Sequence, residues 1–147
     1  KEAISQFQPE IKTKEVRVTV DERGLIISLA ADSFFREASA EVDIEASRDL
    51  LQRIVGLLRT LPDAKYAVEG HTDAIPTDPE GEFESNWELS TIRATNVLHY
   101  LVDLGAQEEK FQIRGHAATM PLASNDTREG RAINRRIDIV ILSEGHM

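Results

Sequence analysis

The stretch that most constrains this chain runs from Val68 to Arg93, where a short apolar segment leads into a polar loop and then into a helical pattern. The loop, residues 74–84, contains two prolines, one glycine and four acidic residues. Asp73 comes just after the expected strand, and Arg93 lies about two turns into the expected helix. A carboxylate and a guanidinium are therefore expected at the two edges of one loop, an arrangement that suits the binding of a small zwitterion.

The composition indicates one globular domain with an excess of negative charge. The chain has 147 residues, a formal net charge of −9 and no cysteine. A chain of this length buries about two-thirds of the surface that it exposes when unfolded, which is enough for a proper core. The charge argues against a nucleic-acid binder, which needs a basic face, and against docking on anionic lipid. Without cysteine, neither a disulfide nor a thiolate metal site can form.

Residues 16–29 predict a β-hairpin. Three valines alternate with polar residues over positions 16–20, which is the period-2 pattern of a half-buried strand. A turn that ends at Gly24 then leads into the apolar run Leu25–Leu29, the expected returning strand. Residues 31–41, which include the pair Phe34-Phe35, are expected to form a loop. Residues 1–14 are polar and predict a linker or a short N-terminal helix, with Ile4, Phe7 and Ile11 on one face.

Two long amphipathic helices are expected in the middle of the chain. The first has Asp43 as its N-cap and ends before Pro62. Its expected apolar face consists of Ile44, Leu51, Ile54, Val55 and Leu58. The second begins with the capping box formed by Ser85 and Glu88 and has Gly105 at its C-terminal end. Its expected buried stripe consists of Ala94, Val97, Leu98, Leu101 and Leu104.

Three further strands are expected at Tyr66–Val68, Phe111–Gly115 and residues 137–141, with a short helix at Thr127–Asn134 before the last of them. The order is hairpin, helix, strand, helix, strand, short helix, strand. This order predicts an α+β fold, a two-layer sandwich in which helices cover one face of a mixed sheet. The segment from Val68 to Pro76 also resembles the segment from Ile113 to Pro121, which fits either two neighbouring strands or chance similarity.

Three motifs resemble the OmpA-like peptidoglycan-binding domain and occur in the same order. They are Gly-His-Thr-Asp at 70–73, Asn-x-x-Leu-Ser-x-x-Arg-Ala at 86–94 and Asn-Arg-Arg at 134–136. The form Ser-Asn-Trp-Glu-Leu-Ser at 85–90, with the long loop before it, is most similar to the MotB branch of flagellar stator proteins. The resemblance covers roughly residues 16–142. It implies a linker or helix over 1–14, the OmpA-like domain over 15–143 and a tail over 144–147.

The resemblance also implies the ligand and the residues that bind it. In the family, the residues that match Asp73 and Arg93 bind the free end of diaminopimelate in the peptidoglycan stem peptide, which carries an ammonium and a carboxylate on one carbon. The carboxylate of Asp73 suits the ammonium, and the guanidinium of Arg93 suits a bidentate bond to the carboxylate. The implied site is completed by Thr72, Asn86, Leu89 and Arg135. Asp73 and Arg93 are expected at the rim of the sheet. Two positions depart from the family pattern, Arg36 and Ala38.

Each of these residues also has a plainer interpretation. Asp73 and Arg93 can form a surface salt bridge with each other. The Asn86 side chain can satisfy backbone groups at the start of its helix, and Arg135 can bind the carbonyls of a helix end. We expect Arg131 and Arg136 to be structural. Trp87 can pack on a sugar, although anchoring the loop to its helix is the expected role.

The sequence predicts neither a metal site nor an enzyme. His71 and Asp73 lie two residues apart, and His116 follows the next strand. This set offers neither a convincing third ligand nor a spaced pair of ligands on a helix, so no metal and no cofactor are expected. The acidic pairs Asp78 with Glu80 and Glu82 with Glu84 lie in the proline-containing loop, which is expected to be solvated, whereas a glycosidase needs two carboxylates in a protected cleft. A cell-wall hydrolase is therefore the least favoured function.

The resulting hypothesis is a non-catalytic module that anchors a flagellar stator to the cell wall. The resemblance implies a periplasmic domain of an inner-membrane protein whose membrane span is absent from this sequence, a homodimer, and an ion-channel partner subunit reached through that span. The alternative is an OmpA-like wall tether of an outer-membrane protein or lipoprotein.

Overall fold

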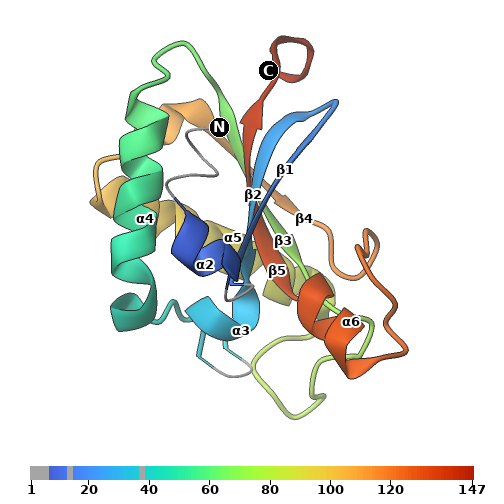
Figure 1. Ribbon diagram of the computed structural model, residues 1–147. Coiled ribbons are helices and arrows are strands. Elements are labelled where there is room, and N and C mark those ends of the chain that lie inside the picture. Colours follow the sequence, from blue (N-terminus) through green and yellow to red (C-terminus); the bar gives the residue numbers. More distant parts are fainter. Residues whose placement is uncertain (1–6, 13–14, 37–38) are drawn as a thin grey trace.

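The computed structural model describes residues 7–12, 15–36 and 39–147, and its centre is a mixed five-stranded sheet (Figure 1). The strand order across the sheet is β1-β2-β5-β3-β4. Neighbouring strands are antiparallel except β3 and β4, which are parallel. The strands are β1 (Val16–Asp21), β2 (Gly24–Ala30), β3 (Tyr66–His71), β4 (Phe111–Gly115) and β5 (Arg136–Leu142).

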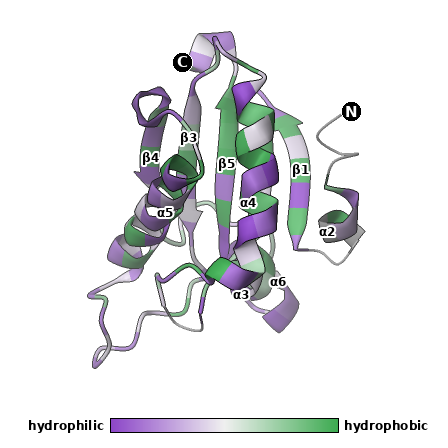
Figure 2. Cartoon of the chain, turned by 90° about the vertical axis from the view of Figure 1, so that its left-hand side faces the viewer, coloured by the Kyte–Doolittle hydropathy of each residue, from purple (hydrophilic) through white to green (hydrophobic). Residues whose placement is uncertain are grey.

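The two long helices, α4 (Ile44–Arg59) and α5 (Asn86–Asp103), lie against the same face of this sheet (Figure 2). The expected α+β architecture is therefore confirmed. The shorter helices are α2 (Gln8–Lys12), α3 (Ala31–Phe34), α6 (Arg128–Asn134) and the 3₁₀ segments η1 (Glu108–Lys110) and η2 (Glu144–His146). Within the described residues, no helix is both long enough and apolar enough to span a lipid bilayer.

The main core lies between the sheet and the long helices. It is built from alternate residues of the strands, such as Ile27, Val68 and Ile139, and from the inner faces of α4 and α5. The expected face of α4 is confirmed except for Ile44, which is 47% exposed. Ile44 is the first residue of the helix, and Ser47 occupies the last buried position at that end. Asp43 caps α4 as expected, since its side chain accepts a hydrogen bond from the backbone N–H of Ala46.

The ends of the helices and the N-terminal segment add three differences from expectation. Leu104 is only half-buried, because it is the C-cap of α5 rather than part of its buried stripe. The expected loop at 31–41 begins with α3, which buries Phe34. Phe7, next to α2, is fully buried in the core. Ile4 and the rest of residues 1–6 lie outside the described residues, as do 13–14.

Two glycines allow α5 to lie directly on the ends of β3 and β4. A Cβ at Gly70 would be 2.0 Å from the backbone oxygen of Ser90, and one at Gly115 would be 1.9 Å from the Thr91 hydroxyl oxygen. The two glycines are partners in the parallel register, as are Val68 and Ile113. The similarity between the two segments therefore reflects neighbouring strands that support one helix. This close packing places the start of α5 beside the end of β3.

Candidate functional site

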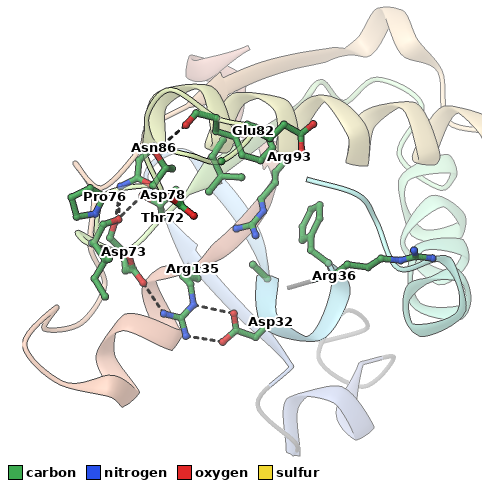
Figure 3. Close-up of a pocket in the computed structure, with 17 residues that line it drawn as sticks. Asp32, Arg36, Thr72, Asp73, Pro76, Asp78, Glu82, Asn86, Arg93 and Arg135 are labelled. Atoms are coloured by element: carbon green, nitrogen blue, oxygen red, sulfur yellow. Dashed lines mark hydrogen bonds and ion pairs between the residues drawn. The ribbon is translucent and has the colours of Figure 1, made fainter. Parts of the chain in front are cut away.

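An open pocket of about 710 Å³ lies where the end of β3, the start of α5, helix α3 and the loop 74–84 meet (Figure 3). The structure brings all six predicted site residues to this pocket, although they come from three separate parts of the chain. They are Thr72, Asp73, Asn86, Leu89, Arg93 and Arg135. The pocket is also lined by Asp32, Phe35 and Arg36, which the sequence argument did not assign to the site.

Asp73 is held in a fixed orientation at one side of the pocket. Its Oδ1 accepts a hydrogen bond of 2.9 Å from the backbone N–H of Ile75, and its Oδ2 accepts one of 2.7 Å from Nη1 of Arg135. The residue is 7% exposed, so it is less open than the expected rim position. Because a carboxylate has about four lone-pair sites, two bonds leave acceptor capacity for a ligand.

Arg93 enters the pocket from α5 and is 6% exposed, again more buried than a rim position. Its Nε donates to the backbone oxygen of Ser39 at 2.8 Å, and its guanidinium carbon lies 5.0 Å from the centre of the Phe35 ring. Burial lowers the pKa of Arg93, but an arginine stays protonated in proteins. Its guanidinium points into the pocket (Figure 3). Neither of its terminal nitrogens forms a hydrogen bond or ion pair with any residue that the structure describes.

Arg135 occupies the position between two carboxylates. Its Nε and Nη2 bind both oxygens of Asp32 at 2.9 and 2.8 Å, and its Nη1 binds Asp73. The hydrogen bond with Asp32 is the main cause that raises the pKa of Arg135. The plainer interpretation of Asp73 and Arg93, a salt bridge between the two, does not hold, because Asp73 pairs with Arg135 instead. As a result, Arg135 has most of its donors occupied, whereas Arg93 does not.

Thr72 and Asn86 fix the backbone at the end of β3. The Thr72 hydroxyl donates to the backbone oxygen of Asp73 at 2.8 Å. The Asn86 amide nitrogen donates to the backbone oxygens of Ile75 at 3.0 Å and Asp73 at 3.4 Å. Asn86 thus binds backbone groups, as in its plainer interpretation, but those groups belong to the strand exit and the loop rather than to the start of its own helix. Its side chain also lines the pocket. Leu89 is half-buried and contributes an apolar part of the wall.

The loop 74–84 differs from expectation in one respect. Phe83 is 8% exposed and lines the pocket, so the loop does have an apolar anchor. Trp87, which was expected to anchor the loop, is 51% exposed. At the start of α5, Ser85 accepts from the backbone N–H of Trp87 and donates to the carboxylate of Glu88, so the two members of the expected capping box bind each other directly.

The remaining arginines have local partners. Arg136 is buried against Asp138 on β5, and Arg131 donates to the backbone oxygen of Asn125, so both have the structural contacts that were expected. Arg36 lines the pocket and forms an exposed ion pair with Glu41. Ala38, the other departure from the family pattern, lies outside the described residues.

The fold and this pocket together define a ligand-binding domain, in which a mixed sheet and one helix present a fixed carboxylate and an available guanidinium to the same space. The model of the OmpA family matches residues 34–135, and the chain belongs to that family.

Comparisons with individual proteins agree with this assignment. The chain is 34% identical to motility protein B of Bacillus subtilis (strain 168) over 96% of this chain and 55% of that protein. It is 40% identical to the peptidoglycan-binding protein ArfA of Mycobacterium tuberculosis (strain H37Rv) over 67% of this chain and 28% of that protein. A solved structure, the cell wall anchor of the T6SS from Pseudomonas aeruginosa, has a TM-score of 0.84 and 33% identity, with 96% of each chain covered. The chain thus spans about half or less of the length of these two sequence relatives.

Proposed function

We propose that this domain binds peptidoglycan without cleaving it, and that the pocket holds the free end of diaminopimelate in the stem peptide. The observation that carries the proposal is the pair formed by Asp73 and Arg93, which face one pocket from different elements and do not neutralise each other. A ligand with an ammonium and a carboxylate on one carbon complements both groups at once.

The hydrogen bonds divide the roles among the three charged residues. Arg93 has two terminal nitrogens available, so it is the group that binds the ligand carboxylate in a bidentate manner. Asp73 accepts from the ligand ammonium. Arg135 orients Asp73 and is itself held by Asp32, so we assign it a positioning role at the edge of the site.

We further propose that the domain anchors a flagellar stator to the wall. The similarity to motility protein B supports this assignment. The alternative, a wall tether outside the flagellar motor, is supported by the peptidoglycan-binding protein ArfA and by the secretion-system wall anchor. The stator proposal includes a periplasmic position, an inner-membrane span, an ion-channel partner subunit and a homodimer. Sedimentation of this chain at high concentration tests the last point, since a strictly monomeric profile would count against dimerisation through this domain.

A hydrolase is less well supported by the site. The acidic residues of the loop, which are Asp78, Glu80, Glu82 and Glu84, are all exposed. Two catalytic carboxylates must instead flank the scissile bond at a fixed separation in a cleft. Asp73 is not paired with a second carboxylate of that kind, because Arg135 lies between it and Asp32.

The test is co-sedimentation with insoluble, diaminopimelate-containing peptidoglycan, followed by chromatography of the supernatant. The wild-type protein should sediment with the wall and release no soluble muropeptides. Asp73→Asn should largely abolish sedimentation, because the asparagine loses the charge that binds the ammonium. Its single carbonyl oxygen can still accept from Ile75 or from Arg135, but its amide nitrogen cannot accept from the other. Glu80→Gln is the matched control, since Glu80 is an exposed acid that does not line the pocket. Release of muropeptides, or full binding by a folded Asp73→Asn protein, would contradict the proposal.

A further inference from the structure

A cluster of three ionisable side chains lies on the face of the sheet opposite the long helices. Glu69 and His71 alternate on β3 with Val68 and Gly70, which face the helices, and His116 follows β4. The rings of the two histidines stack with their centroids 4.8 Å apart and their planes at 20°. Nε2 of His71 lies 3.8 Å from Oε1 of Glu69, and Nε2 of His116 lies 3.5 Å from the same oxygen.

The nitrogens of this cluster lack the partners that buried polar atoms normally have. His71 is 2% exposed, and neither of its ring nitrogens forms a hydrogen bond within the described residues. Nε2 of His116 is also buried and forms no hydrogen bond there, although Oε1 of Glu69 lies 3.5 Å away. Leaving such groups unpaired costs free energy, so a native structure that contains them calls for an explanation. Of these nitrogens, the two Nε2 atoms lie near one carboxylate oxygen, Oε1 of Glu69.

We propose that Glu69, His71 and His116 form a binding site for a divalent transition-metal ion, with Zn²⁺ as the best match. One oxygen and two imidazole nitrogens are the ligand types that zinc prefers. The three ligand atoms lie within 4.8 Å of one another. Ligands at about 2.0–2.2 Å from a tetrahedral zinc ion are separated by about 3.3–3.5 Å. The separations from Glu69, 3.8 and 3.5 Å, therefore need to close by at most a few tenths of an ångström. The two imidazole nitrogens, which lie within 4.8 Å of each other, need to approach by up to about 1.3 Å, so at least one ring has to turn toward the ion.

The groups around the cluster fit a site of this kind. Arg114 donates to Oε2 of Glu69 at 2.8 Å, which orients the carboxylate and leaves Oε1 directed at the histidines. Arg23 donates to Oε1 at 2.7 Å, so it must share that oxygen or move toward its second partner, Asp21. Asp138, with Oδ2 at 3.4 Å from Nε2 of His71, adds a carboxylate beside the ion, although Arg136 also binds this carboxylate. Because of the arginines, we expect moderate rather than very tight binding.

This site was not predicted from the sequence, where the two histidines were considered together with Asp73. The structure places Asp73 in the peptidoglycan pocket, while Glu69 supplies the third ligand from the opposite face of the sheet. The signal in the sequence was the alternation of Glu69 and His71 on one strand, with His116 at the matching position after the parallel neighbour. The proposal does not depend on the proposed function.

The test is a calorimetric titration of the chelator-treated protein with ZnCl₂, together with thermal unfolding. We expect one zinc ion per chain, and a rise in Tm of about 5–10 °C when free zinc is about one hundred times Kd. His116→Ala should abolish both effects, because it removes a ligand at the more open end of the cluster. His99→Ala is the matched control, since His99 is exposed on α5.

The wild-type titration decides the matter even if His116→Ala is poorly folded. Absence of saturable binding, or of any zinc-dependent rise in Tm, would overturn the proposal. Loss of binding in His99→Ala with normal binding in His116→Ala would overturn it as well, because it would place the ion at the surface of α5. Asp73→Asn should bind zinc like the wild-type protein, because Asp73 is not a zinc ligand. The zinc titration and the wall-binding assay therefore test two separate sites, and either proposal can fail without the other.

Discussion

Replacing Arg93 by lysine tests how the pocket binds a carboxylate. Lysine keeps the positive charge but replaces a planar group with several donors by one strongly hydrated ammonium. In this structure, Arg93 also donates from Nε to Ser39 and lies over the ring of Phe35. The terminal nitrogens are therefore presented to the pocket in a fixed plane. A lysine at this position cannot bind Ser39 and present two parallel donors at the same time.

The size of the effect follows from the number of bonds. A hydrogen bond to a charged group is worth about 1.5–3 kcal/mol. Loss of one of two bonds to the ligand should therefore raise Kd by about ten- to a hundredfold. Loss of the bond to Ser39 should reduce stability by about 1.5 kcal/mol, which corresponds to a fall in Tm of about 3–6 °C. Arg93→Lys would keep its full stability only if Arg93 lay at an open rim, and Arg93 is instead buried.

The assay is a calorimetric titration with a soluble, diaminopimelate-containing stem peptide at a temperature where both proteins are folded. Arg36→Lys is the matched control, because Arg36 also lines the pocket but its side chain is exposed and paired with Glu41. Its affinity should change by less than about threefold. Wild-type affinity in folded Arg93→Lys would refute the bidentate role of Arg93, and the carboxylate would then be assigned to Arg135.

Three further predictions concern the surroundings of the pocket. Deletion of residues 79–81 should leave Tm nearly unchanged, whereas Phe83→Ala should lower the free energy of unfolding by about 3 kcal/mol, because Phe83 is buried. Equal losses of Tm in the two variants would contradict this difference. Gly70→Ala should destabilise the fold by about 3 kcal/mol or more in denaturant titrations, since its Cβ would meet the backbone of Ser90, and a neutral effect would disprove the close packing of α5. Asp32→Asn should lower the free energy of unfolding by at most about 1 kcal/mol and should not weaken peptide binding in calorimetry, because an exposed ion pair stabilises little. A large loss of affinity would make Asp32 a ligand contact.

Local patterns predicted the architecture well. The spacing of apolar residues in α4 indicates its buried face, and the structure confirms that face except for Ile44. The alternation of valines in β1 is confirmed as a strand but only in part as a buried face, since Val16 is buried whereas Val20, near the end of the edge strand, is 76% exposed. Asp43 needs only its nearest neighbours to act as a cap. The motifs around Asp73 and Arg93 likewise indicated one pocket. Asp73 follows the end of a strand, Arg93 lies near the start of the next helix, and one loop joins the two.

Features that depend on partners far along the chain were missed. Asp32 reaches Arg135 because β2 pairs with β5, which places Ala30 opposite Arg136. That pairing cannot be read from the neighbourhood of Asp32 in the sequence. The same holds for Phe83, whose burial depends on the pocket that forms around it. Aspartate is usually exposed, whereas phenylalanine is usually buried, so the composition of the acidic loop, and not the residue type, made Phe83 look solvated. Only the tertiary arrangement decided the place of either residue.

The most direct test of the central claim compares two stem peptides that differ in one group. One carries diaminopimelate at its third position, and the other carries lysine, which keeps the terminal ammonium but lacks the carboxylate. We expect the wild-type protein to bind the diaminopimelate peptide at least about tenfold more tightly, and Arg93→Lys to lose most of this preference. Equal affinity of the wild-type protein for the two peptides would contradict the claim that Arg93 binds the carboxylate of the ligand.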